Sequence, residues 1–194
     1  MQLQLPYLII ALLLGLVFLS ILVSISDYRY RRIPNQYLVW GSVYALGIYV
    51  LMFMLLPFAT VIRGFLMSLL GILASGMFFY LPYKYRQVGA GDVKLAMVFG
   101  LFLGFKGAIL AILLGAMVGG VWALALAWKH GGIGHMWYNI KFMAKSMYLS
   151  GFKEMSWDLR SDGAIAMPYG VALCIGATLI AIEQLLIQFE YLQH

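Results

Sequence analysis

The feature that most constrains this chain is a series of long apolar stretches that recur from one end to the other. Of its 194 residues, 64% are hydrophobic and only 10% are charged. Soluble domains average roughly 45–50% apolar and 25% charged residues. A transmembrane helix needs roughly 20 apolar residues, so the chain has room for about six such helices and little else. The sequence therefore predicts an all-α polytopic membrane protein with a single transmembrane domain over residues 1–194.

Polar and glycine-rich segments divide this domain into six predicted transmembrane helices and one amphipathic segment. Pro34 suits the first turn of the second helix, where its missing N–H is not needed, and Pro57 ends that helix. The Gly-x-x-x-Gly spacings that begin at Gly100 and Gly115 predict close helix packing. Residues 129–163 mix basic and aromatic side chains, which predicts an amphipathic segment on the cytoplasmic membrane face or over the mouth of the bundle. The predicted spans are residues 5–26, 36–56, 61–81, 93–103, 108–128 and 164–189.

The distribution of Lys and Arg predicts the orientation in the membrane. Basic residues concentrate on the cytoplasmic side of membrane proteins. Only Arg63 and Lys106 lie on the side opposite to the other basic loops. We therefore expect a multi-pass protein of the cell (inner or plasma) membrane with both termini outside. The basic residues assigned to the cytoplasmic side are Arg29, Arg31, Arg32, Lys84, Arg86, Lys94, Lys129, Lys141, Lys145, Lys153 and Arg160.

Charge and cysteine content exclude several other classes of protein. The formal net charge is +6, but its basic residues form short clusters beside the apolar stretches, which favours contact with membrane lipid over binding of nucleic acid. The single cysteine, Cys174, excludes a disulfide framework and a Cys-x-x-Cys site. His130, His135 and His194 have no metal-ligand spacing. We expect no metal and no other cofactor.

Two aspartates, Asp27 and Asp92, lie where apolar stretches begin or end on the predicted cytoplasmic side. Ionisable groups at such positions are costly and are by default candidates for function. Asp92 could instead cap the helix that follows it. Asp27 ends the first apolar stretch, where the helix dipole disfavours an anion, although the three arginines at positions 29, 31 and 32 could pair with it. If the two aspartates meet, one as base and the other protonated, they can activate water for peptide hydrolysis.

The residues around both aspartates resemble the type IV prepilin peptidase family. Residues 27–35, Asp-Tyr-Arg-Tyr-Arg-Arg-Ile-Pro-Asn, resemble its Asp-x-Arg…Ile-Pro-Asn signature. Residues 89–94, Gly-Ala-Gly-Asp-Val-Lys, resemble its Gly-x-Gly-Asp signature. The resemblance implies that Asp27 and Asp92 are catalytic and that Gly89, Gly91 and Lys94 support the substrate loop. Pro168, Tyr169 and Gly170 resemble the family's Pro-Tyr-Gly stretch in the last helix, although Val171 replaces its second proline.

The resemblance also implies a substrate and a branch of the family. The substrate would be a prepilin-like precursor (of a type IV pilin, a tight-adherence pilin or an archaeal flagellin), with a short basic leader, a glycine and then an apolar segment. Cleavage would occur at the cytoplasmic membrane face. Bifunctional members carry a four-cysteine insertion and N-methylate the product, so a chain with one cysteine resembles the peptidase-only branch. The alternatives are a presenilin-like intramembrane aspartyl protease and a non-enzymatic transporter or secretion-platform subunit.

Overall fold

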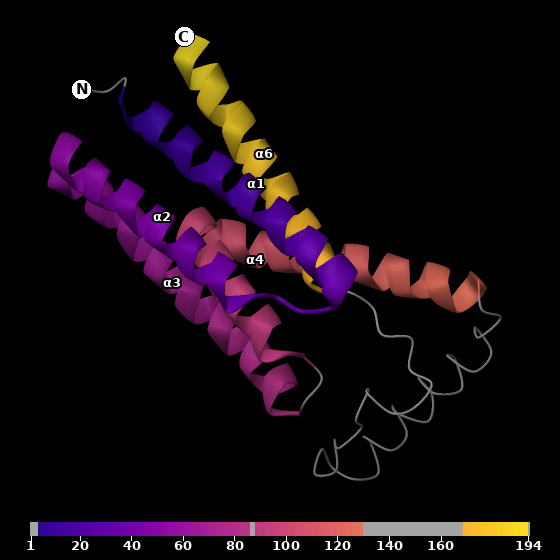
Figure 1. Ribbon diagram of the computed structural model, residues 1–194. Coiled ribbons are helices and arrows are strands. Elements are labelled where there is room, and N and C mark those ends of the chain that lie inside the picture. Colours follow the sequence, from indigo (N-terminus) through magenta and orange to yellow (C-terminus); the bar gives the residue numbers. More distant parts are fainter. Residues whose placement is uncertain (1–3, 86–87, 130–168, 194) are drawn as a thin grey trace.

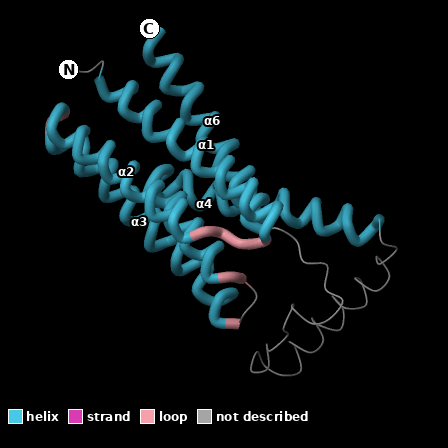
Figure 2. The backbone as a smooth tube through the Cα atoms, viewed as in Figure 1, coloured by secondary structure: helices cyan, strands magenta, loops and turns pink. Residues whose placement is uncertain are grey.

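The fold is a bundle of long helices. The computed structural model describes residues 4–85, 88–129 and 169–193, and within these ranges the backbone is helix and short loop (Figures 1 and 2). Each of the five elements is long and apolar enough to cross a membrane. The predicted all-α membrane fold is confirmed, and the chain is a multi-pass membrane protein. The elements are α1 (Gln4–Tyr30), α2 (Asn35–Leu55), α3 (Phe58–Lys84), α4 (Ala90–Lys129) and α6 (Tyr169–Gln193).

The predicted fourth and fifth spans both lie within α4, which is broken at Gly104. The backbone of Gly104 has φ 69° and ψ −176°, a conformation that essentially only glycine adopts without strain. The first arm of α4 (residues 90–103) is about 21 Å long at 1.5 Å per residue, shorter than the roughly 30 Å hydrocarbon core. The break therefore separates a short arm, which begins beside the link between α3 and α4, from a longer second arm (residues 105–129).

α1 and α3 continue beyond their predicted ends. The predicted first span ends at residue 26, but α1 runs to Tyr30, so Asp27 lies inside its last turn instead of following it. The N–H of Arg31 closes this turn by donating to the carbonyl of Asp27 (2.8 Å). α3 passes through Pro82 to Lys84, because a proline in the last turn removes only one helical hydrogen bond. The predicted amphipathic segment from residue 130 onward and residues 164–168 lie outside the described ranges.

Glycines set the close approach of α4 to its neighbours. A Cβ on Gly71 of α3 would lie 2.7 Å from the carbonyl oxygen of Gly100. A Cβ on Gly176 of α6 would lie 2.5 Å from the backbone nitrogen of Gly115. No side chain fits at such distances, so these pairs bring the backbones of α3, α4 and α6 into contact. The close packing predicted from the glycine spacings at Gly100 and Gly115 is confirmed.

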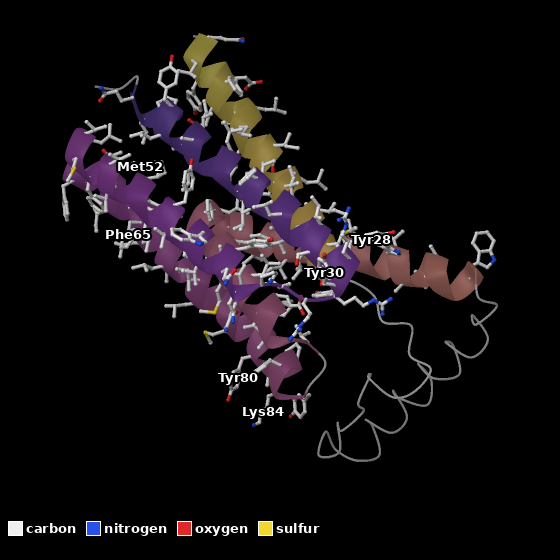
Figure 3. The ribbon with its side chains drawn as sticks, in the orientation of Figure 1. Tyr28, Tyr30, Met52, Phe65, Tyr80 and Lys84 are labelled. Carbon is white, nitrogen blue, oxygen red and sulfur yellow. The ribbon has the colours of Figure 1, made fainter. Side chains whose placement is uncertain are left out.

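Helix pairing places two distant chain segments at one end of the bundle. α6 packs against α1 and against α4, and α4 packs against α3. In Figure 1 the two termini lie at one end, and the end of α1 lies beside the beginning of α6 at the other. Exposed tyrosines Tyr28, Tyr30 and Tyr80 project from the last turns of α1 and α3 (Figure 3). Tyrosines are enriched at membrane–water interfaces, so this end has the character of an interface.

Candidate active site

Asp27 is a buried carboxylate held by the first turn of α6. Its side chain is 6% exposed, and its Oδ2 accepts a hydrogen bond from the backbone N–H of Val171 (3.1 Å). Because the first N–H groups of a helix have no partner inside the helix, they bind anions well. Burial of a charge is costly without such partners, so the start of α6 accounts for the position of Asp27.

Gly170 gives Asp27 access to the backbone of α6. A Cβ at this position would lie 2.8 Å from Oδ2 of Asp27 and 3.0 Å from Cδ1 of Ile33. Any larger residue would therefore displace the carboxylate or the isoleucine. Glycine at position 170 therefore leaves room for the Asp27 carboxylate beside the helix.

Asp92 lies in the first turn of α4 and is partly exposed. Its Oδ2 accepts a hydrogen bond from the N–H of Gly89 (3.2 Å), while the N–H of Asp92 donates to the carbonyl of Gly89 (3.1 Å). These reciprocal bonds fix the glycine loop at the start of the helix. A carboxylate has about four acceptor sites on two oxygens, so this bond leaves Asp92 able to accept a hydrogen bond from water.

Ile33, in the link between α1 and α2, joins the two halves of the site. A Cβ on Gly91 would lie 3.2 Å from Cβ of Ile33, and a Cβ on Gly170 would lie 3.0 Å from Cδ1 of the same residue. The isoleucine therefore packs between the glycine loop that carries Asp92 and the helix start that holds Asp27. Thus the fold brings the two predicted aspartates together at one end of the bundle.

Two more of the predicted residues border this site. The ammonium of Lys94 donates to Oδ1 of Asn35 (3.1 Å) and links the start of α4 to the start of α2. The ring of Tyr169 packs edge-on against Phe79, with centroids 6.3 Å apart. Pro168, the remaining predicted site residue, lies outside the described residues.

Sequence reasoning missed the residues that hold the site together. Ile33 and Val171 contribute packing and a backbone N–H, neither of which a side-chain pattern reveals. The hydroxyl of Ser26 donates to the carbonyl of Arg32 (3.0 Å), and Arg31 has a positive φ of 49°. Together they turn the chain so that Ile33 faces inward. The position of Ile33 next to Pro34 in the recognised motif was the one available signal.

Comparison with known proteins identifies the family of the chain. The family model for the type IV leader peptidase family matches residues 13–124. This chain belongs to the type IV leader peptidase family. The match covers more than half of the chain and includes both Asp27 and Asp92. No curated protein and no solved structure matches the chain significantly.

Membership of the type IV leader peptidase family makes the chain a membrane peptidase that acts on a prepilin-like substrate. The first turn of α6, with Gly170 and Val171, lies outside the matched region, although it contacts Asp27. Among the residues that the structure describes, no three His, Cys, Asp or Glu side chains gather where they could hold a metal ion.

Proposed function

We propose that this peptidase is an aspartic endopeptidase in which Asp27 and Asp92 together activate water. One observation carries the proposal: two carboxylates that are 65 positions apart in the sequence lie at one end of the bundle, where Ile33 packs against both the glycine loop of Asp92 and the helix start that holds Asp27. Each is fixed by a backbone N–H at a helix start. Asp27 is buried, whereas the partial exposure of Asp92 leaves water access to the pair.

The chemistry follows from the repulsion between two nearby carboxylates, which favours a state with one shared proton. The ionised carboxylate takes a proton from water, and the water oxygen adds to the scissile carbonyl carbon. The protonated carboxyl donates a hydrogen bond to the carbonyl oxygen as negative charge develops on that oxygen. The tetrahedral intermediate then collapses, the carbon–nitrogen bond breaks, and a carboxyl group protonates the leaving nitrogen. Neither role is assigned to a particular aspartate, because the pair titrates as a unit.

The proposed reaction is removal of the leader from a prepilin-like precursor at the cytoplasmic membrane face. Two observations support this face. The exposed Tyr28, Tyr30 and Tyr80 lie at the site end of the bundle. The basic residues Arg29, Arg31 and Lys84 lie there too, as the positive-inside rule requires of a cytoplasmic side. Both termini would then lie outside, and residues 1–194 would form one peptidase domain.

Asparagine substitution tests the catalytic roles without removing the helix contacts. Asparagine caps helix starts about as well as aspartate, so Asp27→Asn and Asp92→Asn preserve that structural role but cannot exchange a proton. We expect each to lower cleavage of a co-expressed precursor by at least ~10²-fold at normal accumulation. The matched control is Glu183→Gln, an exposed acid-to-amide change in α6 distant from the site. Near wild-type cleavage by either aspartate variant would refute the proposal.

We also propose that the protein is a peptidase without N-methyltransferase activity. The sequence contains one cysteine, which is buried in α6. It therefore lacks the four-cysteine insertion that the bifunctional members carry, and it resembles the peptidase-only branch. The purified protein should cleave its precursor without transferring a methyl group from S-adenosylmethionine to the new amino terminus. Mass spectrometry of the processed amino terminus measures both results, and a methylated product would contradict this part of the proposal.

A further inference from the structure

A groove runs along the bundle surface between α2 and the first arm of α4. It encloses about 590 Å³, and its walls are mainly apolar side chains from α2, α4 and one residue of α3. One end carries Asn35 and Lys94, and the rest is apolar apart from Ser42. The lining residues on which the inference depends are Asn35, Val39, Leu46, Lys94, Val98 and Leu101.

The shape of the groove suits the packing of a third helix between α2 and α4. On α2 its lining residues recur with helical spacing from Asn35 to Leu46, and on α4 from Lys94 to Leu101. Rows of side chains with this spacing form the grooves into which a neighbouring helix packs. From Asn35 to Leu46 the groove is about 17 Å long, at 1.5 Å per residue. That length corresponds to about half of the hydrocarbon core.

The polar end of the groove adjoins the candidate active site. The hydrogen bond between Lys94 and Asn35 (3.1 Å) crosses the groove at this end. Lys94 follows Asp92 by two positions on α4. Asn35, the first residue of α2, follows Ile33 by two positions. A lysine ammonium stays at the aqueous interface while its stem covers apolar surface. The bridge therefore marks the membrane surface, with the aspartates on one side and the apolar groove on the other.

We propose that this groove binds the apolar segment of the prepilin-like substrate as a helix. The inference rests on the proposed function of Asp27 and Asp92 and extends it to a binding surface. A substrate helix in the groove would end at the Lys94–Asn35 bridge, and the chain preceding it would pass directly to the carboxylates. The occupant is an apolar helix continuous with a polar leader, because the groove changes from aliphatic to polar at the point where it meets the site.

A pair of leucines on α2 provides a matched test. Leu46 lines the groove, whereas Leu51 does not; both side chains are 45% exposed. The two lie about 140° apart around the helix, at 3.6 residues per turn. Leu46→Trp should raise the KM for a precursor about tenfold with little change in kcat, because it fills the groove without touching the carboxylates. Leu51→Trp should leave both constants unchanged, and equal effects of the two variants would overturn the proposal.

Photo-crosslinking separates substrate binding from cleavage. The photoreactive amino acid p-benzoylphenylalanine replaces Leu46 or Leu51 in the Asp92→Asn protein. The probe is a synthetic precursor with a short basic leader, a glycine and roughly 20 apolar residues. A crosslink to the apolar segment from position 46 and not from position 51 supports the groove. Crosslinking at both positions, at neither position or only to lipid overturns it. Cleavage by the unmodified protein is measured separately. The crosslinking result can therefore refute binding in the groove while the catalytic proposal stands, and the cleavage result can refute the catalytic proposal while binding in the groove stands.

Discussion

The substitution Gly170→Ala tests whether the position of Asp27 controls the reaction rate. The added Cβ would lie 2.8 Å from Oδ2 and 3.1 Å from Cγ of Asp27. Both atoms belong to the carboxylate that we propose as catalytic. The substitution adds one methyl group, changes no charge and leaves every proposed catalytic residue in place.

The expected size of the effect follows from the distance. Ordinary van der Waals contact begins at 3.4 Å, so the Asp27 oxygen must move by about 0.6 Å to accommodate the methyl group. A displacement of 1 Å in an active site can cost about 10²-fold in rate. A shift of this size should therefore lower kcat about tenfold. The same movement disturbs the bond from the N–H of Val171 to Oδ2, so the carboxylate also becomes less well ordered.

Two glycines serve as controls for the measurement. The assay is conversion of a precursor by purified enzyme in detergent, with accumulation in the membrane measured in parallel. Gly47→Ala should change neither quantity, because no heavy atom lies within 4 Å of the added Cβ. Gly176→Ala should reduce accumulation, because its Cβ would lie 2.5 Å from the backbone nitrogen of Gly115. Wild-type kcat in Gly170→Ala, at normal accumulation, would refute the idea that Asp27 must hold this position.

Two further predictions concern the bundle. Gly104→Ala should lower the unfolding temperature by several degrees in a thermal-shift assay: no atom lies nearer than 3.7 Å to the added Cβ, but the φ of 69° imposes roughly 1–3 kcal/mol of strain. Gly76→Ala, with 3.6 Å to its nearest neighbour, should be neutral, and equal stability of both variants would contradict the strain. Tyr49→Phe removes a buried 2.6 Å hydrogen bond to Ser68. The substitution should lower the free energy of unfolding by ~0.6 kcal/mol, which corresponds to a fall of about 2 °C in the unfolding temperature. An unchanged unfolding temperature would show that the bond contributes nothing to stability.

Much of the fold followed from the sequence because the membrane restricts what an apolar chain can form. Apolar length predicted where the helices lie, and the predicted break at residues 104–107 is present at Gly104. Helix ends were harder to predict, because they depend on contacts from elsewhere. The first span was expected to end before Asp27, yet the chain remains helical to Tyr30. Apolar content ends at residue 26, but helical hydrogen bonding continues until the positive φ of Arg31 turns the chain.

The candidate site was predicted only in part, because sequence motifs reveal side chains but not the backbone groups that contact them. The motifs predicted that Asp27 and Asp92 act together, and in the fold Ile33 packs against both the loop that carries Asp92 and the helix start that holds Asp27. What the sequence could not show is which backbone groups hold them. The N–H of Val171 is 144 positions away from Asp27, and no side-chain pattern signals a backbone donor. The same holds for Ile33, which packs against Gly91 in the first turn of α4 and Gly170 in the first turn of α6 without any polar contact that a motif could reveal.

The structure also changes the reasoning about Asp27. From the sequence, an anion at a helix C-terminus was unfavourable, which favoured a functional role over a capping role. In the folded chain Asp27 faces the N-terminus of α6, where an anion is stabilised. A capping role is therefore available to both aspartates. Capping and catalysis are compatible, however, because a helix N–H that binds one carboxylate oxygen orients the group while leaving acceptor sites for water. The asparagine variants separate the two roles, because asparagine retains the cap and loses the proton transfer.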